Sequence, residues 1–407
     1  MRFTILTASI IIQVCLGGLY AWSTFVPSLK CSYGLTTAQT QIIFGTLIGV
    51  FTLTMILSGK LMEEKGPRLL LILSGLLFAI GYGIASMSYG IFTLLLLGIG
   101  VIVGAATGLG YVCPLAVCMR WFPNHKGLVT GIAVAGFGGG AVLLANVVEH
   151  PLEQGIDVLL IFRWIGLIYG AIVLLAGLFI IFPPEKKEKI GCAISLNALI
   201  ALLIKDLFFC TLTCAMFSTT FAGLLVIGNL MPMALASGIE PAVAAIGISA
   251  FAIGNATGRI AWGRLVDRML FKSVQASMFF LMFALAGLWL IASSTILFIG
   301  VSFFIGFGFG ASFVIHAALV ASHYGINRVG NIYPFIFLGY GIAGITGPVI
   351  GGWLYDLTGS YTPSITVSMG VVAVGLLISA RLLYQARFIA GKSGLCDARL
   401  NSEGGGA

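Results

Sequence analysis

Charged residues are scarce in this chain, and their scarcity excludes most classes of soluble protein. Only 8% of the 407 residues are Asp, Glu, Lys or Arg, whereas 59% are apolar and the mean hydropathy is +1.10. A typical soluble domain has about 25% charged residues. The composition therefore predicts an integral membrane protein.

Several chemical devices are also absent. All 13 acidic residues map to expected loops, span ends or the C-terminal tail, so no buried carboxylate is available to bind a proton or a metal ion. The eight cysteines show no metal-ligand spacing, and we interpret them as packing residues. The sequence has no H-E-x-x-H and no G-x-S-x-G motif, and its loops are too short for a catalytic domain. We therefore expect no enzyme activity, no metal and no cofactor.

Long apolar runs are what the chain has in abundance. Each is long enough to cross a hydrocarbon core of about 30 Å, which takes about 20 helical residues. The first run keeps Gln13 and Tyr20 and shows no cleavage pattern, so we interpret it as a span and not as a signal peptide. The runs predict twelve spans, at residues 4–27, 41–61, 69–87, 91–119, 128–148, 158–182, 207–235, 242–262, 273–292, 295–321, 331–355 and 363–386.

The distribution of basic residues predicts the orientation. With both termini in the cytoplasm, all of the 21 lysines and arginines except Lys30, Arg163 and Arg259 fall on the inner side. The net charge of +8 is thus explained by topology, and nucleic-acid binding has no support. Short loops and tails favour a prokaryotic inner membrane.

An internal repeat divides the chain into two halves. The segment 59–65 recurs as 263–269, and Gly-Phe-Gly at 136–138 matches Gly-Tyr-Gly at 339–341. We expect an N-terminal half at 1–182, a connector at 183–206, a C-terminal half at 207–388 and a flexible tail at 389–407. The charged connector is interpreted as a solvated linker in preference to a partner-binding segment.

Arg259 stands out because it lies within an apolar run with no acidic residue close by. A charge inside a membrane span costs about 2.5–3.5 kcal/mol on insertion scales and is usually functional. Its expected partner is an anion that binds and leaves. The alternative is an arginine that extends along the helix to the cytoplasmic surface.

Two six-span halves with a site between them resemble the major facilitator fold, which implies an all-α membrane protein of 12 transmembrane helices in two pseudo-symmetric six-helix halves. The segment 59–68 resembles the family's loop signature, with Glu63 where an Asp usually stands. Within that superfamily, segments 120–128, 228–232 and 352–361 are similar to monocarboxylate transporters and to the related oxalate/formate exchangers. The resemblance implies transport of a small carboxylate.

The resemblance also implies a binding site. Arg259 occupies the position of a substrate-binding arginine, and Asn255 lies one turn before it. Tyr340 stands where the exchangers carry a lysine, and a single fixed cation favours a monocarboxylate over a dianion. For each aromatic residue taken alone, core packing is an equally good explanation. The remaining candidates for the substrate site are Tyr20, Tyr111, Phe137, Phe309 and Phe313.

Proton coupling has less support in the residues. Many monocarboxylate transporters have an aspartate and a lysine at the positions of Asn255 and Thr24, so that relay is missing here. His316 is the only histidine within a span, and its unperturbed pKa of about 6.5 allows proton exchange. It is equally a candidate for a neutral packing residue, and a third possibility is a proton carried by water or by the substrate.

The repeated loop is expected to hold the halves together and release them, although its charges would also serve simply to anchor the spans. Its candidate gating residues are Gly59, Glu63, Arg68, Gly263, Asp267 and Arg268.

The sequence thus predicts a carrier of a small monocarboxylate such as lactate or pyruvate in the lipid bilayer, with proton symport favoured. The alternatives are a carboxylate exchanger and a non-transporting sensor built on the same frame.

Overall fold

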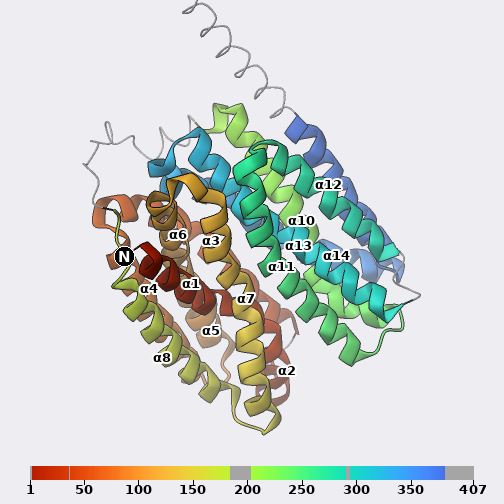
Figure 1. Ribbon diagram of the computed structural model, residues 1–407. Coiled ribbons are helices and arrows are strands. Elements are labelled where there is room, and N and C mark those ends of the chain that lie inside the picture. Colours follow the sequence, from red (N-terminus) through yellow and green to blue (C-terminus); the bar gives the residue numbers. More distant parts are fainter. Residues whose placement is uncertain (1, 36, 184–202, 290–293, 381–407) are drawn as a thin grey trace, which may run out of the picture.

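The computed structural model describes residues 2–35, 37–183, 203–289 and 294–380, and these residues are almost entirely helical (Figure 1). Twelve helices within them are long and apolar enough to cross a membrane, one for each predicted run. The expected spans 273–292 and 363–386 are described as far as Trp289 and Ala380. The protein is a multi-pass integral membrane protein.

The first half consists of six spans, two of which have irregular turns. The first span passes from α-helix through a 3₁₀ turn at Gly18–Ala21, and the fourth contains a π-helical stretch, η2, at Leu96–Val103. The helices are α1 (Arg2–Gly17), α2 (Trp22–Tyr33), α3 (Thr37–Lys65), α4 (Pro67–Ser86), α5 (Phe92–Leu95), α6 (Gly104–Trp121), α7 (Lys126–Glu153) and α8 (Val158–Gly177).

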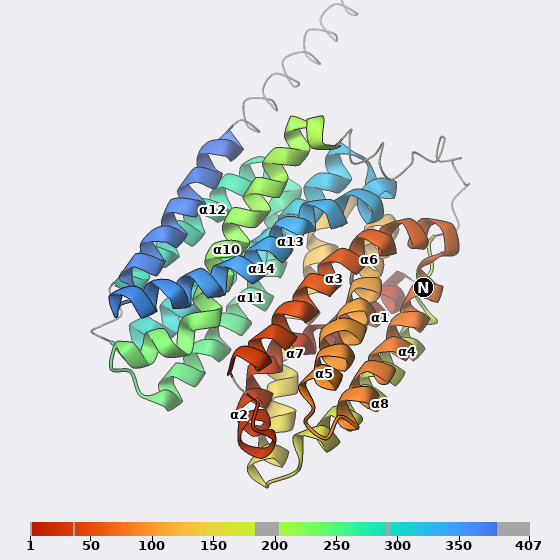
Figure 2. The ribbon, with the colours of Figure 1, turned by 180° about the vertical axis from the view of Figure 1, so that it is seen from behind.

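The second half repeats this arrangement. Its helices are α10 (Leu207–Ala236), α11 (Pro241–Met269), α12 (Lys272–Ala286), α13 (Thr295–His323), α14 (Val329–Thr358) and a last span at Thr362–Ala380. In Figures 1 and 2 the red-to-olive helices of the first half lie beside the green-to-blue helices of the second. The predicted boundaries at 182 and 207 stay predictions, because residues 184–202 and 381–407 lie outside the described part of the chain.

Two helix pairs carry most of the contact between the halves, namely α7 with α11 and α3 with α14. Both pairs are antiparallel. At one end of the molecule α3, α6 and α11 end while α7 and α14 begin. We call this end, which carries Lys65, Arg120, Lys126, Arg268 and Arg328, the basic end, and the other the opposite end.

Candidate functional site between the halves

Arg259 lies in the middle of α11 and is completely buried, with 0% of its surface exposed. Its side chain therefore does not extend to the membrane surface, and the alternative interpretation of an exposed head group is wrong. Gly254 and Gly258 explain how α11 comes so close to α13, because an added Cβ on either would overlap the backbone carbonyl of Phe303 or Phe307.

The guanidinium group of Arg259 binds to both halves. Its Nε donates to Asn255 Oδ1 at 3.0 Å, and its Nη1 donates to the Val134 carbonyl of α7 at 2.8 Å. Nη2 is buried and has no hydrogen-bond partner among the described residues. A buried donor without a partner costs about 1–3 kcal/mol, more for a charged group. One nitrogen of this cation thus remains ready to donate to an anion.

Aromatic faces cover the same guanidinium. Its carbon lies 4.3 Å from the ring centroid of Phe313 on α13 and 5.8 Å from that of Phe137 on α7. Both distances fall within the roughly 6 Å range of cation–π attraction. Phe137 belongs to the first half and Phe313 to the second, so the rings approach the cation from both sides of the interface.

Tyrosine hydroxyl groups surround this centre. Tyr20 and Tyr340 hydrogen-bond to each other across the interface. The Tyr333 hydroxyl donates to the Phe313 carbonyl at 3.0 Å and is a close neighbour of Tyr111. Among the residues that the structure describes, the site therefore contains several neutral donors and one fixed positive charge, that of Arg259.

The rings of Tyr111, Phe137 and Tyr340 belong to one aromatic cluster. Tyr111 and Phe137 have centroids 4.9 Å apart, and Phe313 lies 5.4 Å from Tyr340. Phe51 and Phe337, which the sequence did not single out, also belong to the cluster, and their ring centroids lie 5.5 Å apart. This packing brings aromatic rings of both halves together around the site.

A cavity of about 290 Å³ lies between the halves toward the opposite end. Three of the predicted residues line it, namely Tyr20, Asn255 and Phe309, as does Thr24. Since Asn255 accepts from Arg259 and Tyr20 bonds to Tyr340, the cavity reaches within one side chain of the buried centre. Its volume is just below the roughly 300–1,000 Å³ of sites for drug-sized ligands, so it suits a small molecule.

His316 follows Phe313 by three residues, about one turn, on the same helix. It is buried on α13, with Nδ1 at 2.7 Å from the Ser312 carbonyl. Its Nε2 has no hydrogen-bond partner with acceptable geometry among the described residues. No hydrogen bond or ring contact of the described residues joins His316 to Arg259 or to the tyrosines of the site.

At the basic end the halves touch through pairs of glycines. Gly59 of α3 packs against Gly330 of α14, and Gly263 of α11 against Gly127 of α7, so closely that an added Cβ would overlap the facing carbonyl oxygen. The two contacts are related by the internal repeat, because Gly59 corresponds to Gly263 and Gly127 to Gly330. The repeat thus closes the basic end symmetrically.

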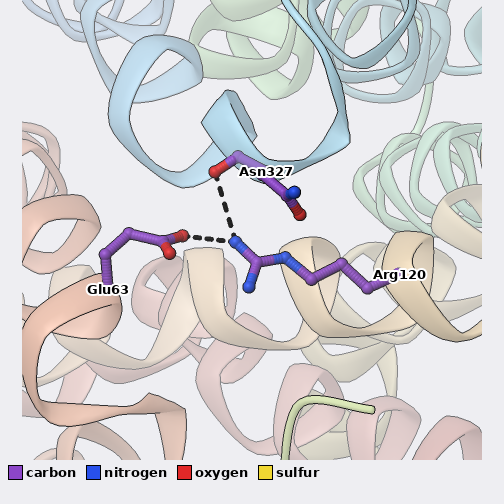
Figure 3. Close-up of polar contacts among 3 residues, drawn as sticks. All are labelled: Glu63, Arg120 and Asn327. Carbon is purple, nitrogen blue, oxygen red and sulfur yellow. Dashed lines mark hydrogen bonds and ion pairs between the residues drawn. The ribbon is translucent and has the colours of Figure 1, made fainter. Parts of the chain in front are cut away.

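Carboxylates strengthen this closure in two different ways. Glu63 pairs with Arg120 of its own half at 2.5 Å, and the same nitrogen of Arg120 donates to the Asn327 carbonyl of the other half at 3.2 Å (Figure 3). Asp267 instead accepts from the backbone N–H groups of Gly127 and Leu128 at 2.8 and 3.0 Å. These groups begin α7, where the helix dipole favours an anion.

Two predicted gating residues are not part of the closure. Arg68 and Arg268 are exposed, and neither enters a hydrogen bond or ion pair recorded between described residues. The residue that pairs with Glu63 is Arg120, and the gating role of Arg68 and Arg268 stays a prediction.

The arrangement of two repeated helix bundles around a central cation can be compared with known proteins. The family model described as "Major Facilitator Superfamily" matches residues 8–223 and again residues 207–392. The chain belongs to the major facilitator superfamily. The resemblance of the sequence to this family is confirmed, and so is the predicted twelve-helix fold. Family and fold are those of transporters and not of enzymes.

Curated members of the superfamily resemble the chain over much of its length. The oxalate:formate antiporter of Oxalobacter formigenes is 26% identical over 66% of this chain and 64% of its own, and apicoplast pyruvate carrier 1 of Toxoplasma gondii is 24% identical over 81% and 79%. Mouse monocarboxylate transporter 12 is 25% identical over 72% and 66%. The names of these three relatives refer to oxalate and formate, to pyruvate and to monocarboxylates.

A solved structure in the superfamily shares the fold. The Escherichia coli fucose:proton symporter FucP, described in its outward conformation, superimposes with a TM-score of 0.69 at 19% identity and covers 91% of this chain and 97% of its own.

Within this major facilitator site, sequence reasoning missed Tyr333, Phe337 and Phe51. Phe337 lies one helical turn before Tyr340, and Phe51 corresponds to Asn255 in the internal repeat at a shift of 204 residues. Applying the repeat to each candidate in turn would have found Phe51. No group of three or more His, Cys, Asp or Glu side chains among the described residues is placed to hold a metal ion.

Proposed function

We propose that this protein carries small monocarboxylates across the membrane by alternating access, with the carboxylate of the substrate bound to Arg259. The observation that carries the proposal is a completely buried guanidinium with one nitrogen, Nη2, that has no protein partner among the described residues. A guanidinium stays protonated at any working pH, and its planar fork matches a carboxylate.

The charge of the site favours a monocarboxylate over a dianion. Among the described residues, no Lys, His or second Arg hydrogen-bonds to the groups around Arg259, and Tyr340 of α14 supplies a neutral hydroxyl. A second carboxylate buried there would lack a countercharge, which costs several kcal/mol. Lactate, pyruvate, acetate and formate all meet this requirement. The relatives named for oxalate and formate, for pyruvate and for monocarboxylates support a small carboxylate as the substrate class, and the preference for a monocarboxylate rests on the charge of the site.

The access route follows from the contacts between halves. The basic end is closed by glycine pairs and by Glu63 and Asp267, while the cavity lies toward the opposite end. The excess of basic residues at the closed end supports a cytoplasmic position for that end and for both termini, in a prokaryotic inner membrane. Rocking of one half against the other would then expose the site to each side in turn.

For the coupling, we propose proton symport in which the proton travels with the substrate or through water, because His316 has no recorded contact with the site. Carboxylate exchange is a second candidate, and one observation favours it: no described carboxylate pairs with Arg259 in place of a substrate. A non-transporting sensor would show the same binding residues but no flux.

The test is uptake of labelled L-lactate into proteoliposomes, with an imposed inward proton gradient, without one, and after preloading with unlabelled carboxylate. Accumulation that follows the gradient supports symport. Uptake that ignores the gradient and requires preloading supports exchange and refutes symport. Saturable binding without either flux refutes transport and identifies a sensor.

A further inference from the structure

A carrier with a fixed buried cation has to solve a problem in the half of its cycle that follows release of the anion. To return, the site must close again around Arg259. A buried charge without compensation is strongly disfavoured. Unless the protein itself compensates the charge, only the loaded carrier can close, and the protein would be restricted to exchange.

The described residues supply compensation of an uncharged kind. The Phe313 ring faces the guanidinium at 4.3 Å, and the Phe137 ring lies at 5.8 Å on the side of the other half. The Val134 carbonyl and the Asn255 amide oxygen accept from Nη1 and Nε. Since all four groups belong to the protein, they are available whether or not a substrate is present.

These protein groups bind the guanidinium weakly enough that a substrate carboxylate can replace them. A desolvated aromatic face attracts a cation, but more weakly than a carboxylate that forms charge-assisted hydrogen bonds. A carboxylate side chain beside Arg259 would compete with the anionic substrate at every cycle. An aromatic face compensates the cation and still lets a substrate carboxylate displace it.

Phe313 is the principal ring in this arrangement. It is the closer of the two, it is almost fully buried, and it packs against Phe309 and Tyr340 at 5.1 and 5.4 Å. Its backbone carbonyl accepts the Tyr333 hydroxyl. These contacts hold the face of the ring toward the guanidinium.

We infer that Phe313, assisted by Phe137, compensates the charge of Arg259 when no anion is bound, so that the carrier returns without substrate and catalyses net flux in addition to exchange. The inference rests on the proposed function, because it needs a carboxylate that binds to Arg259. It assigns Phe313 a positioning role in the return step, beyond that of an apolar wall for the substrate.

The experiment compares two fluxes of the same probe through the same variants. Proteoliposomes take up labelled L-lactate either empty, which requires return of the unloaded carrier, or preloaded with unlabelled L-lactate, which does not. In both experiments the internal pH equals the external pH, and the membrane potential is the same. Phe313→Leu removes the ring face, Phe313→Tyr keeps it, and Phe298→Leu removes a buried ring from the same helix far from Arg259.

We expect the ratio of net uptake to exchange to fall on the order of tenfold in Phe313→Leu, because only net uptake requires return of the unloaded carrier. Phe313→Tyr and Phe298→Leu should keep the wild-type ratio of net uptake to exchange. If Phe313→Leu is not recovered folded, Phe137→Leu is measured in its place. It should show a smaller fall in the ratio of net uptake to exchange.

Three results overturn the inference. An equal fall of both fluxes in Phe313→Leu would show that the ring serves the substrate and not the return step. Wild-type exchange without net uptake would show an obligatory exchanger, and the proposed carboxylate transport would stand. No wild-type flux of L-lactate, pyruvate, acetate or formate in either assay would refute the proposed function together with the inference.

Discussion

A methyl group at Gly59 should open the basic end of the protein. The Cβ of an alanine there would overlap the backbone carbonyl oxygen of Gly330 in the other half, and a backbone atom cannot rotate away. Overpacking of this kind typically costs about 1–3 kcal/mol. The cost applies only while α3 and α14 touch at this end, so it should shift the equilibrium toward the conformation open at the basic end about 5- to 150-fold.

Pulsed electron–electron double resonance, which measures the distance between two spin labels, can measure the shift. Spin labels at Lys65 and Lys272 are exposed and belong to different halves at the basic end, so their separation reports its opening. Gly59→Ala should increase the population at long distance. Gly49→Ala is the matched control on the same helix, because an added Cβ there meets nothing within 4 Å. Equal distance distributions in Gly59→Ala and Gly49→Ala would refute the assignment of the glycine pair as a closure.

Three further predictions concern single side chains. Glu63→Gln should also raise the long-distance population, since it removes the charge that holds Arg120 at Asn327. Adding Arg120→Met to this variant should change the population little more, because the ion pair is already broken. Fully additive effects of the two substitutions would contradict the pairing. Tyr340→Lys should make oxalate a competitor of labelled L-lactate uptake, because it places a second cation at the site, and unchanged competition would argue against Tyr340 as a substrate contact. His316→Gln should keep the stimulation of uptake by a proton gradient, since His316 has no recorded contact with the site; loss of gradient stimulation with intact exchange would identify His316 as the proton carrier.

The fold was largely predictable because each of its determinants is local in the sequence. Every predicted apolar run became a span, since length and hydropathy alone decide whether a helix can cross the bilayer. The repeat at 59–65 and 263–269 predicted two similar halves, and its glycines do meet glycines of the other half. What the repeat did not predict is that Glu63 and Asp267 act differently, one on a side chain and one on a helix N-terminus.

The site was only partly predictable, for a physical reason. Arg259 could be identified because a lone charge in an apolar run is costly wherever it lies. Its partners could not, since the contact with the Val134 carbonyl depends on how closely α7 and α11 approach. The bond between Tyr20 and Tyr340 joins residues from opposite ends of the chain, and no pattern in either segment indicates it. The exposure of Arg68 likewise depends on the turn at Gly66, whose φ of +85° sets the direction of α4.

Equilibrium binding of labelled L-lactate to the purified protein tests the central claim most directly, by comparing the wild type with Arg259→Gln and Arg259→Lys. Hydrogen bonds to a charged group contribute about 1.5–3 kcal/mol, so we predict saturable binding by the wild type and a loss of affinity of roughly 10- to 150-fold in Arg259→Gln. Arg259→Lys should fall in between, because it keeps the charge but not the planar fork. Saturable wild-type binding that is unchanged in Arg259→Gln would contradict the account.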